Sequence, residues 1–260
     1  MDLTTHNTKT DPADLLGDPN EIESLAGAFG PYTVIRRLGA GMQGVAYLAA
    51  APHGPSVVIK AVEPTRRSRR AMDEEVRALR AVGGIFAPSV LDYRPEALRP
   101  YLVMEYLEGR TLEEELAGGL LSETGTLRLA VGLSALLSAV HAAAVAHGDF
   151  RAKNLIVSPG GLYAVDYGCA RLRADSRSEF RRRRQADLLW LGIHIARAGS
   201  GAFPFSDDWG KAIEDYHDGK IDLGSMSGVP RAVARALLSN RAGRRPAAHT
   251  IHARLLGSKA

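Results

Sequence analysis

The sequence has 260 residues, 45% of them hydrophobic, which suits one enzyme-sized domain or two associated lobes with a sizeable core. Its single cysteine, Cys169, excludes an internal disulfide and disfavours a cysteine-based zinc site. The net charge of +4 is uneven, because acidic residues gather in the first 30 positions and arginines in two later runs. No uninterrupted apolar stretch is as long as the about 18 residues that a membrane-spanning helix needs. No secretory signal is evident. A soluble, cytoplasmic protein without a membrane partner is therefore expected.

The chain begins with an acidic leader, residues 1–30, which is expected to be partly flexible. Within it, Glu21–Phe29 is compatible with a short helix. Apolar runs then predict five strands, at about 32–39, 44–51, 56–62, 90–95 and 101–106. Between the third and fourth strands, apolar residues at helical spacing predict a helix over 69–82.

From Leu112 onward the pattern is mostly helical, with helices predicted over 127–144, 185–197 and 229–238. The expected fold class is α+β, with a small β-rich lobe that carries one crossing helix and a mainly helical second lobe. The domain occupies 31–260, divided into a first lobe at about 31–104, a hinge at about 105–109 and a second lobe at about 110–260.

Two motifs in the second half carry chemistry. The first, HGDFRAKN, spans residues 147–154, and the second, VDYG, spans 165–168. Asp149 can accept a hydroxyl proton, Asn154 and Asp166 can hold Mg²⁺, and a cation between them can neutralise a phosphate. The combination predicts phosphoryl transfer from ATP.

A glycine-rich turn and a lysine precede these motifs. Gly39, Gly41 and Gly44 lie between two predicted strands, which favours a flap over phosphates and not a dinucleotide-binding turn that opens a helix. Lys60 ends the third predicted strand, and Glu75 lies on the predicted helix. The two side chains are expected to pair, so that the ammonium group is held for the α- and β-phosphates.

In order and spacing, these segments resemble the protein-kinase superfamily over roughly residues 32–252. The resemblance implies a bilobal fold that uses ATP and Mg²⁺, with the three glycines covering the phosphates. It also implies a buried support for the catalytic loop at Asp187 and an arginine-proline pair at Arg245. The implied site comprises Asp149, Lys60, Glu75 and Arg151 for catalysis, Asn154 and Asp166 as Mg²⁺ ligands, and Ala46, Val58, Met104, Glu105, Leu107 and Ile156 around the adenine.

The chain departs from the family pattern at three places. Gly148 stands where an arginine commonly grips an activation-segment phosphate, so activation by phosphorylation there is not expected. Arg151 replaces the common lysine two residues after the base, and these cations are not interchangeable. The segment between Gly168 and Asp187 is short and lacks the Ala-Pro-Glu that typical protein kinases use near their peptide platform. The acceptor is therefore open, and Arg245 would lack its usual glutamate partner.

The two arginine runs are expected to form one surface, which we call the basic rim. It would bind an acidic peptide or, less favoured, a nucleic-acid backbone, and a solvated surface without a partner carries equal weight. The acidic leader is a candidate cover for this surface. The basic rim consists of Arg66, Arg67, Arg69, Arg70, Arg181, Arg182, Arg183 and Arg184.

The sequence thus predicts an ATP- and Mg²⁺-dependent kinase that phosphorylates a Ser or Thr hydroxyl of a protein or peptide. A phosphotransferase for sugars or antibiotics is one alternative, which the His-Gly-Asp loop supports. A kinase acting on a precursor peptide in natural-product biosynthesis is another. A nucleotide-binding scaffold fits less well, because Lys60, Glu75, Asp149, Asn154 and Asp166 are all present.

Overall fold

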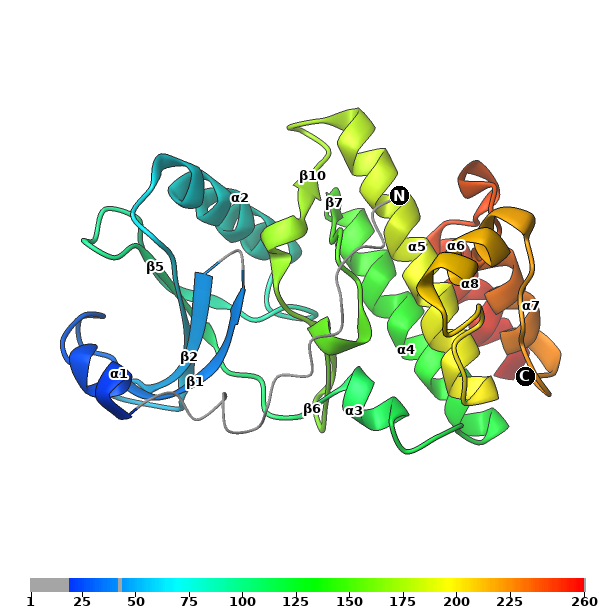
Figure 1. Ribbon diagram of the computed structural model, residues 1–260, viewed down its shortest axis with the longest axis horizontal. Helices are drawn as coiled ribbons and strands as arrows, with labels where there is room; N and C mark the ends of the chain where they lie inside the picture. Colours follow the sequence, from blue (N-terminus) through cyan, green and yellow to red (C-terminus); the bar gives the residue numbers. More distant parts are fainter. Residues whose placement is uncertain (1–18, 42–43, 260) are drawn as a thin grey trace. The chain divides into compact units, whose positions relative to one another are not determined.

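The computed structural model describes residues 19–41 and 44–259, which divide into two units (Figure 1). The first holds the described residues up to Gly84 together with Pro88–Leu107, and the second holds Ile85–Ala87 and the described residues from Glu108 onward. Residues 1–18 of the acidic leader and Met42–Gln43 of the glycine-rich turn lie outside the described residues.

The first unit is built on an antiparallel sheet with strand order β1-β2-β3-β5-β4. Its strands are β1 (Thr33–Gly41), β2 (Gly44–Ala50), β3 (Val57–Ala61), β4 (Val90–Arg94) and β5 (Tyr101–Glu105). The predicted helix is α2 (Arg66–Val82), which begins where the Thr65 hydroxyl accepts a hydrogen bond from the Ser68 amide at 3.1 Å. The strands and this helix lie close to their expected bounds.

The helix expected over Glu21–Phe29 is shorter in the structure. It forms α1 (Pro19–Ser24), and turns follow it up to the sheet. Gly27, which precedes Phe29, adopts a φ angle of +74°, and Gly30, which follows it, adopts +62°, so helical geometry does not continue through this segment.

The two faces of this sheet differ. Tyr47, Ile59 and Val103 are fully buried on one face, in the same core as Phe29. Side chains alternate along a strand, so the residues between these core positions point to the other face. That second face carries Ala46, Val58, Lys60 and Met104, with Ala46 paired to Lys60 and Val58 paired to Met104 across the strands.

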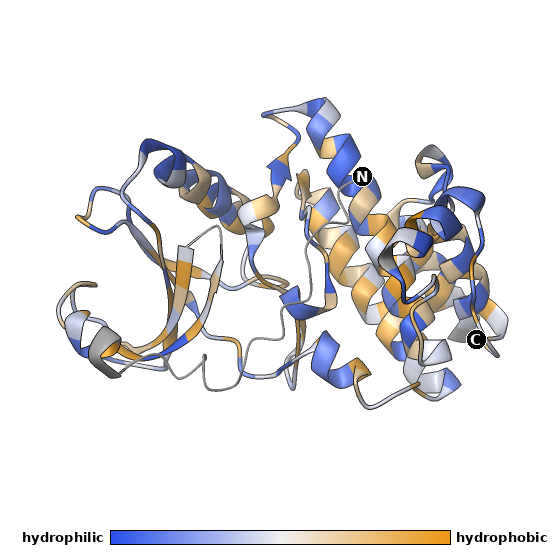
Figure 2. Cartoon of the chain, viewed as in Figure 1, coloured by the Kyte–Doolittle hydropathy of each residue, from blue (hydrophilic) through white to orange (hydrophobic). Residues whose placement is uncertain are grey.

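Helices dominate the second unit. They are α3 (Leu112–Leu116), α4 (Glu123–Ala142), α5 (Arg177–Ser200), α6 (Trp209–Asp218), α7 (Gly228–Leu237) and α8 (Ala248–Leu256). α4 packs against α5 and α8, and α5 also packs against α7. Figure 2 shows hydrophobic residues along α4 and hydrophilic ones on the first turns of α5. This division leaves the start of α5 polar and its later turns in the core.

α4 is long and apolar enough, by length and composition, to cross a membrane, although the sequence analysis expected no such segment. Leu133, Leu136 and Leu137 of α4 are fully buried within the unit. The same composition thus serves a core helix here.

α5 begins earlier than the helix predicted over 185–197. Ser176 precedes its first turn, and the Ser176 hydroxyl accepts a hydrogen bond from the Glu179 amide at 3.3 Å. Arginine is a good helix former, so the run Arg181–Arg184 continues the helix from this cap.

Short strands join the helices and position the motif residues. They are β6 (Arg110–Thr111), β7 (Val145–Ala146), β8 (Leu155–Ser158), β9 (Gly161–Ala164) and β10 (Arg171–Leu172). β6, β8 and β9 form one small sheet, and β7 pairs with β10. With one β-rich unit carrying a single long helix and one mainly helical unit, the α+β fold class is confirmed.

Candidate active site

Lys60 and Glu75 form the ion pair that the sequence predicts. The Lys60 Nζ atom lies 2.8 Å from Glu75 Oε1 and 2.7 Å from Glu75 Oε2. Both residues are buried, at 8% and 3% exposure, so each charge needs the other to offset the loss of water. Lys60 is thereby held on the sheet face that also carries Ala46, Val58 and Met104.

The glycines of the predicted phosphate flap differ in what requires them. At Gly44 the φ angle is +114°, and an added Cβ would lie 2.2 Å from the Ala61 carbonyl oxygen. At Gly39 and Gly41, an added Cβ would meet nothing within 4 Å among the described residues. The packing of the first unit therefore demands a glycine at Gly44 and leaves the other two unexplained by the fold.

Asp149 is held by two neighbours in the loop after β7. Arg151 donates to both carboxylate oxygens, from Nε to Oδ1 at 2.5 Å and from Nη2 to Oδ2 at 3.0 Å. Asn154 donates from Nδ2 to Asp149 Oδ2 at 2.8 Å and to the Asp149 carbonyl oxygen at 3.0 Å. These bonds fix the carboxylate while leaving the Asp149 side chain 19% exposed.

The β8–β9 hairpin brings the two predicted metal ligands to the same end. Leu155 pairs with Ala164, and the Val165 amide donates to the Asn154 carbonyl oxygen at 2.9 Å. Asp166 follows directly and is exposed, with a left-handed backbone at φ +60°. Asn154 therefore directly precedes the hairpin and Asp166 follows it, at the same end.

These two side chains fit the chemistry of a magnesium ion. The Asn154 amide nitrogen faces Asp149, which turns the amide oxygen away from that carboxylate. Mg²⁺ is commonly held by one or two protein oxygens, and substrate phosphates and waters complete its shell. The described residues contain no group of three or more His, Cys, Asp or Glu placed to hold a metal.

Asp187 supports the loop from α5. Its fully buried carboxylate accepts from the His147 amide at 2.9 Å and from the Gly148 amide at 2.8 Å. His141 Nε2 also donates to it, at 3.1 Å. The carboxylate therefore fixes the backbone just before Asp149 and stays satisfied without water.

His147 supports the same loop through its ring. Its Nε2 donates to the Val165 carbonyl oxygen at 3.0 Å, and its Nδ1 accepts from the Asp149 amide at 3.3 Å. The ring also packs on Tyr167, with centroids 4.6 Å apart. Both ring nitrogens are used in hydrogen bonds to the backbone, so His147 supports the loop.

The remaining predicted adenine residues fall in both units. Glu105 and Leu107 end the first unit, where the Glu105 amide donates to the Ser89 carbonyl oxygen at 3.0 Å. Ile156 is half-buried on β8 of the second unit.

Comparison with known proteins shows the family of the chain. The family described as the protein kinase domain matches residues 32–186. The chain belongs to the protein kinase domain family.

Named relatives of this kinase domain are bacterial. It is 35% identical over 160 residues to the probable serine/threonine-protein kinase PkwA of Thermomonospora curvata, covering 60% of this chain and 21% of that protein. It is 34% identical over 155 residues to the serine/threonine-protein kinase AfsK of Streptomyces griseus, covering 54% and 18%. The probable serine/threonine-protein kinase YbdM of Bacillus subtilis is 27% identical over 173 residues, covering 62% and 66%. The chain spans only about a fifth of the length of the first two relatives.

The kinase domain has a physical reason for glycine at position 148. The φ angle of Gly148 is +81°, and an added Cβ would lie 2.4 Å from the Cys169 carbonyl oxygen and 2.7 Å from Arg183 Cδ. Arg183 also donates to the Gly148 carbonyl oxygen at 3.4 Å. The space beside position 148 is thus filled by a side chain from α5, a contact that no local sequence signal reveals.

Arg245 of this kinase domain has partners other than a glutamate. It donates from Nη1 to the Gln185 carbonyl oxygen at 2.7 Å and from Nη2 to the Ser239 carbonyl oxygen at 2.8 Å. Its Nη2 also donates to the Tyr216 hydroxyl at 2.5 Å. Backbone oxygens and a tyrosine therefore satisfy the buried guanidinium and join α5 to the C-terminal elements.

Proposed function

We propose that this chain is an ATP- and Mg²⁺-dependent kinase that transfers the γ-phosphate to a Ser or Thr hydroxyl of a protein or peptide. The observation that carries the proposal is the Asp149 carboxylate, which Arg151 and Asn154 hold in a loop supported from α5. Relatives named as serine/threonine-protein kinases support the choice of acceptor.

Each chain residue contributes through its charge and position. Asp149 accepts the proton of the attacking hydroxyl and aims that hydroxyl at the phosphate. Lys60, which Glu75 holds in place, donates to the α- and β-phosphates of ATP. Ala46, Val58 and Met104 share the face of Lys60 and offer an apolar contact for the adenine. Positioning and electrostatics then lower the barrier without a covalent enzyme intermediate.

Mg²⁺ would be held by Asn154 and Asp166, and it would supply positive charge that neutralises the phosphates. The two residues flank the β8–β9 hairpin, and its pairing of Leu155 with Ala164 supports the proposal by bringing their backbones close together.

Arg151 is proposed to position Asp149. A forked guanidinium can engage both oxygens of a carboxylate, which a lysine ammonium at this place would not match. The contact with Asp149 would explain why an arginine replaces the common lysine at position 151.

For the acceptor, we infer an acidic segment that contacts the α5 part of the basic rim, Arg181–Arg184. The charge of the basic rim is partly balanced within the chain, because Arg70 Nε lies 3.3 Å from Glu74 and Arg182 Nη2 lies 2.7 Å from Glu179. Arg181 is exposed beside this second pair. Changing Arg181→Glu should weaken binding of an acidic acceptor peptide and leave ATP binding unchanged. Equal peptide binding would remove the basic rim from the proposal.

A small-molecule acceptor is the second candidate, and one observation favours it. α5 begins at Arg177, so the stretch before Asp187, which seats a peptide in typical protein kinases, is largely helix here.

The deciding experiment is transfer from radiolabelled ATP with Mg²⁺ to separate pools of proteins, acidic peptides and small molecules. Label on phosphoserine or phosphothreonine of a protein or peptide is the expected result. Label confined to the small-molecule pool would replace the first candidate by the second.

A further inference from the structure

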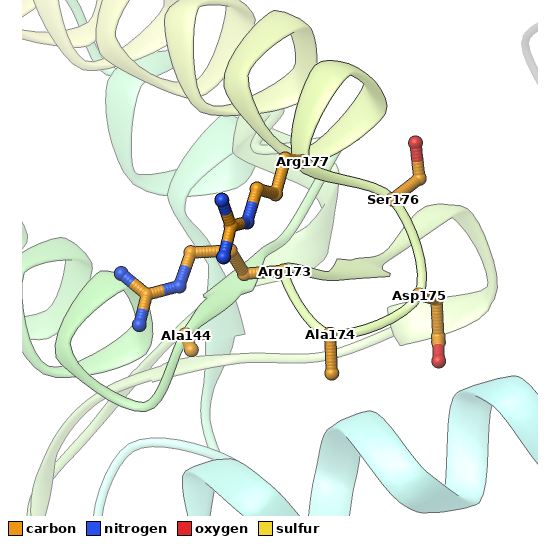
Figure 3. Close-up of a pocket in the computed structure, with 6 residues that line it drawn as sticks. All are labelled: Ala144, Arg173, Ala174, Asp175, Ser176 and Arg177. Carbon is orange, nitrogen blue, oxygen red and sulfur yellow. The ribbon is translucent and has the colours of Figure 1, made fainter.

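An open cavity of about 530 Å³ lies on the second unit, in the loop between β10 and α5 (Figure 3). Its lining consists of Ala144, Arg173, Ala174, Asp175, Ser176 and Arg177. The loop is fixed at both ends, since the Arg173 amide donates to the Ala144 carbonyl oxygen at 2.9 Å and Ser176 caps α5. The cavity therefore has a defined wall.

Two guanidinium groups extend into this cavity. Figure 3 shows the side chains of Arg173 and Arg177 reaching to the same side of the loop, toward Ala144, while Asp175 and Ser176 point away from them. Neither guanidinium forms an ion pair or side-chain hydrogen bond with the described residues. The small side chain of Ala144 leaves the space in front of them open.

This arrangement gathers positive charge on the wall of the cavity. Two like charges face the same cavity, and Arg177 is the first residue of α5, where the helix dipole is positive. In the first turn only Glu179 is acidic, and its carboxylate contacts Arg182, 2.7 Å away. An anion in the cavity would offset this positive charge.

We propose that this cavity binds a phosphate group carried by a Ser or Thr side chain of the acceptor protein. A phosphate monoester carries up to two negative charges and three acceptor oxygens, which matches two forked guanidinium groups. A carboxylate offers one charge and two oxygens, enough for one guanidinium. The acceptor of the proposed kinase would then already be phosphorylated near the residue it presents to Asp149. This step rests on the proposed function, whereas phosphate binding in the cavity does not require transfer.

The test measures peptide binding to the intact chain by fluorescence anisotropy. Three labelled peptides of one sequence carry phosphoserine, serine or aspartate at the same position. The wild type should bind the phosphoserine peptide at least about tenfold more tightly than the serine peptide, as expected for charge-assisted hydrogen bonds. The double variant Arg173→Gln/Arg177→Gln should lose this difference.

The matched control is Arg128→Gln, at an exposed arginine on α4 of the same unit. It should keep the wild-type preference, and thermal melting should show that all variants fold. Equal binding of the serine and phosphoserine peptides, or an unchanged preference in the double variant, would overturn the site. Binding of inorganic phosphate as tight as that of the phosphopeptide would overturn the assignment to an acceptor side chain. Since binding is the readout, failure of phosphate transfer in the acceptor pools would be seen separately.

Discussion

At the scale of single residues, two glycines of the motifs differ in how the fold constrains them. Gly148 combines a φ angle of +81° with the nearby Cys169 carbonyl oxygen, so the fold itself excludes a side chain. At Gly39 an added Cβ would meet no atom of the described residues within 4 Å, so these residues give no steric reason for glycine there.

Gly148→Ala should therefore lower the free energy of unfolding by at least about 1 kcal/mol, because a non-glycine residue is strained at positive φ. Gly39→Ala should leave that free energy within about 0.5 kcal/mol of wild type but weaken ATP binding. Urea unfolding and ATP titration measure the two quantities. Wild-type stability of Gly148→Ala would contradict the assigned geometry.

The sequence predicts a positive charge at Arg151, but it does not predict the contact of Arg151 with the Asp149 carboxylate. If it positions Asp149, Arg151→Ala should lower kcat by roughly ten- to a hundredfold, the cost of a misplaced reacting group. Arg151→Lys should recover only part of the loss, because an ammonium cannot fork across both oxygens. Steady-state kinetics with ATP varied gives the answer. A change confined to the KM for ATP would instead assign Arg151 to the phosphates.

The sequence predicts a contact between two residues when each lies on an element with a clear periodic pattern. Lys60 and Glu75 each lie on a well-patterned element, so their pairing follows from the expected strand and helix. The contact of Arg183 with Gly148 depends on where α5 passes the loop, and nothing in either motif specifies that.

At the scale of elements, α5 supports the catalytic loop at two levels. Asp187 binds the loop amides before Asp149, and His194 Nε2 donates to the Phe150 carbonyl oxygen at 2.8 Å. Burial lowers the pKa of His194 to about 4, because a charged imidazolium would lose its water.

This shift predicts a pH dependence of stability. The folded-state pKa of His194 lies below its ordinary value of about 6.5, so the unfolded chain binds the proton more readily. The contribution is fully present above pH 6.5 and is lost as the pH falls toward about 4, by on the order of a few kcal/mol. His194→Gln should show a shallower fall over this range in urea unfolding, whereas exposed His249→Gln should match wild type. Parallel curves for wild type and His194→Gln would contradict this role.

Long, strongly patterned elements were the ones predicted from sequence. The strands of the first unit and α2 show clear periodicity, and α4 has the length and composition of a buried helix. The first turns of α5 carry arginines where an apolar stripe would be, so only the Ser176 cap signals their start. The short strands near the motifs have too few residues for a period to be distinct. α6 was not predicted, although it is ten residues long, like the predicted α7.

At the scale of the whole molecule, the proposed reaction draws on both units. Lys60 and Glu75 belong to the first, and Asp149, Asn154 and Asp166 belong to the second. Family resemblance predicted this distribution, and the match over 32–186 contains all five residues. The C-terminal part beyond the match is held to α5 through Arg245, which donates to the Gln185 carbonyl oxygen. The sequence predicts that Arg245 lacks its usual glutamate partner, but it does not predict which groups take the place of that glutamate.

The most direct test of the central claim compares wild type with Asp149→Asn. Phosphate transfer and ATP affinity are measured on the same preparations with Mg²⁺. The variant is expected to lose transfer, because an amide cannot accept the hydroxyl proton, while ATP binding changes little. Transfer at the wild-type rate by Asp149→Asn would contradict the assignment of Asp149 as the base and with it the proposed mechanism.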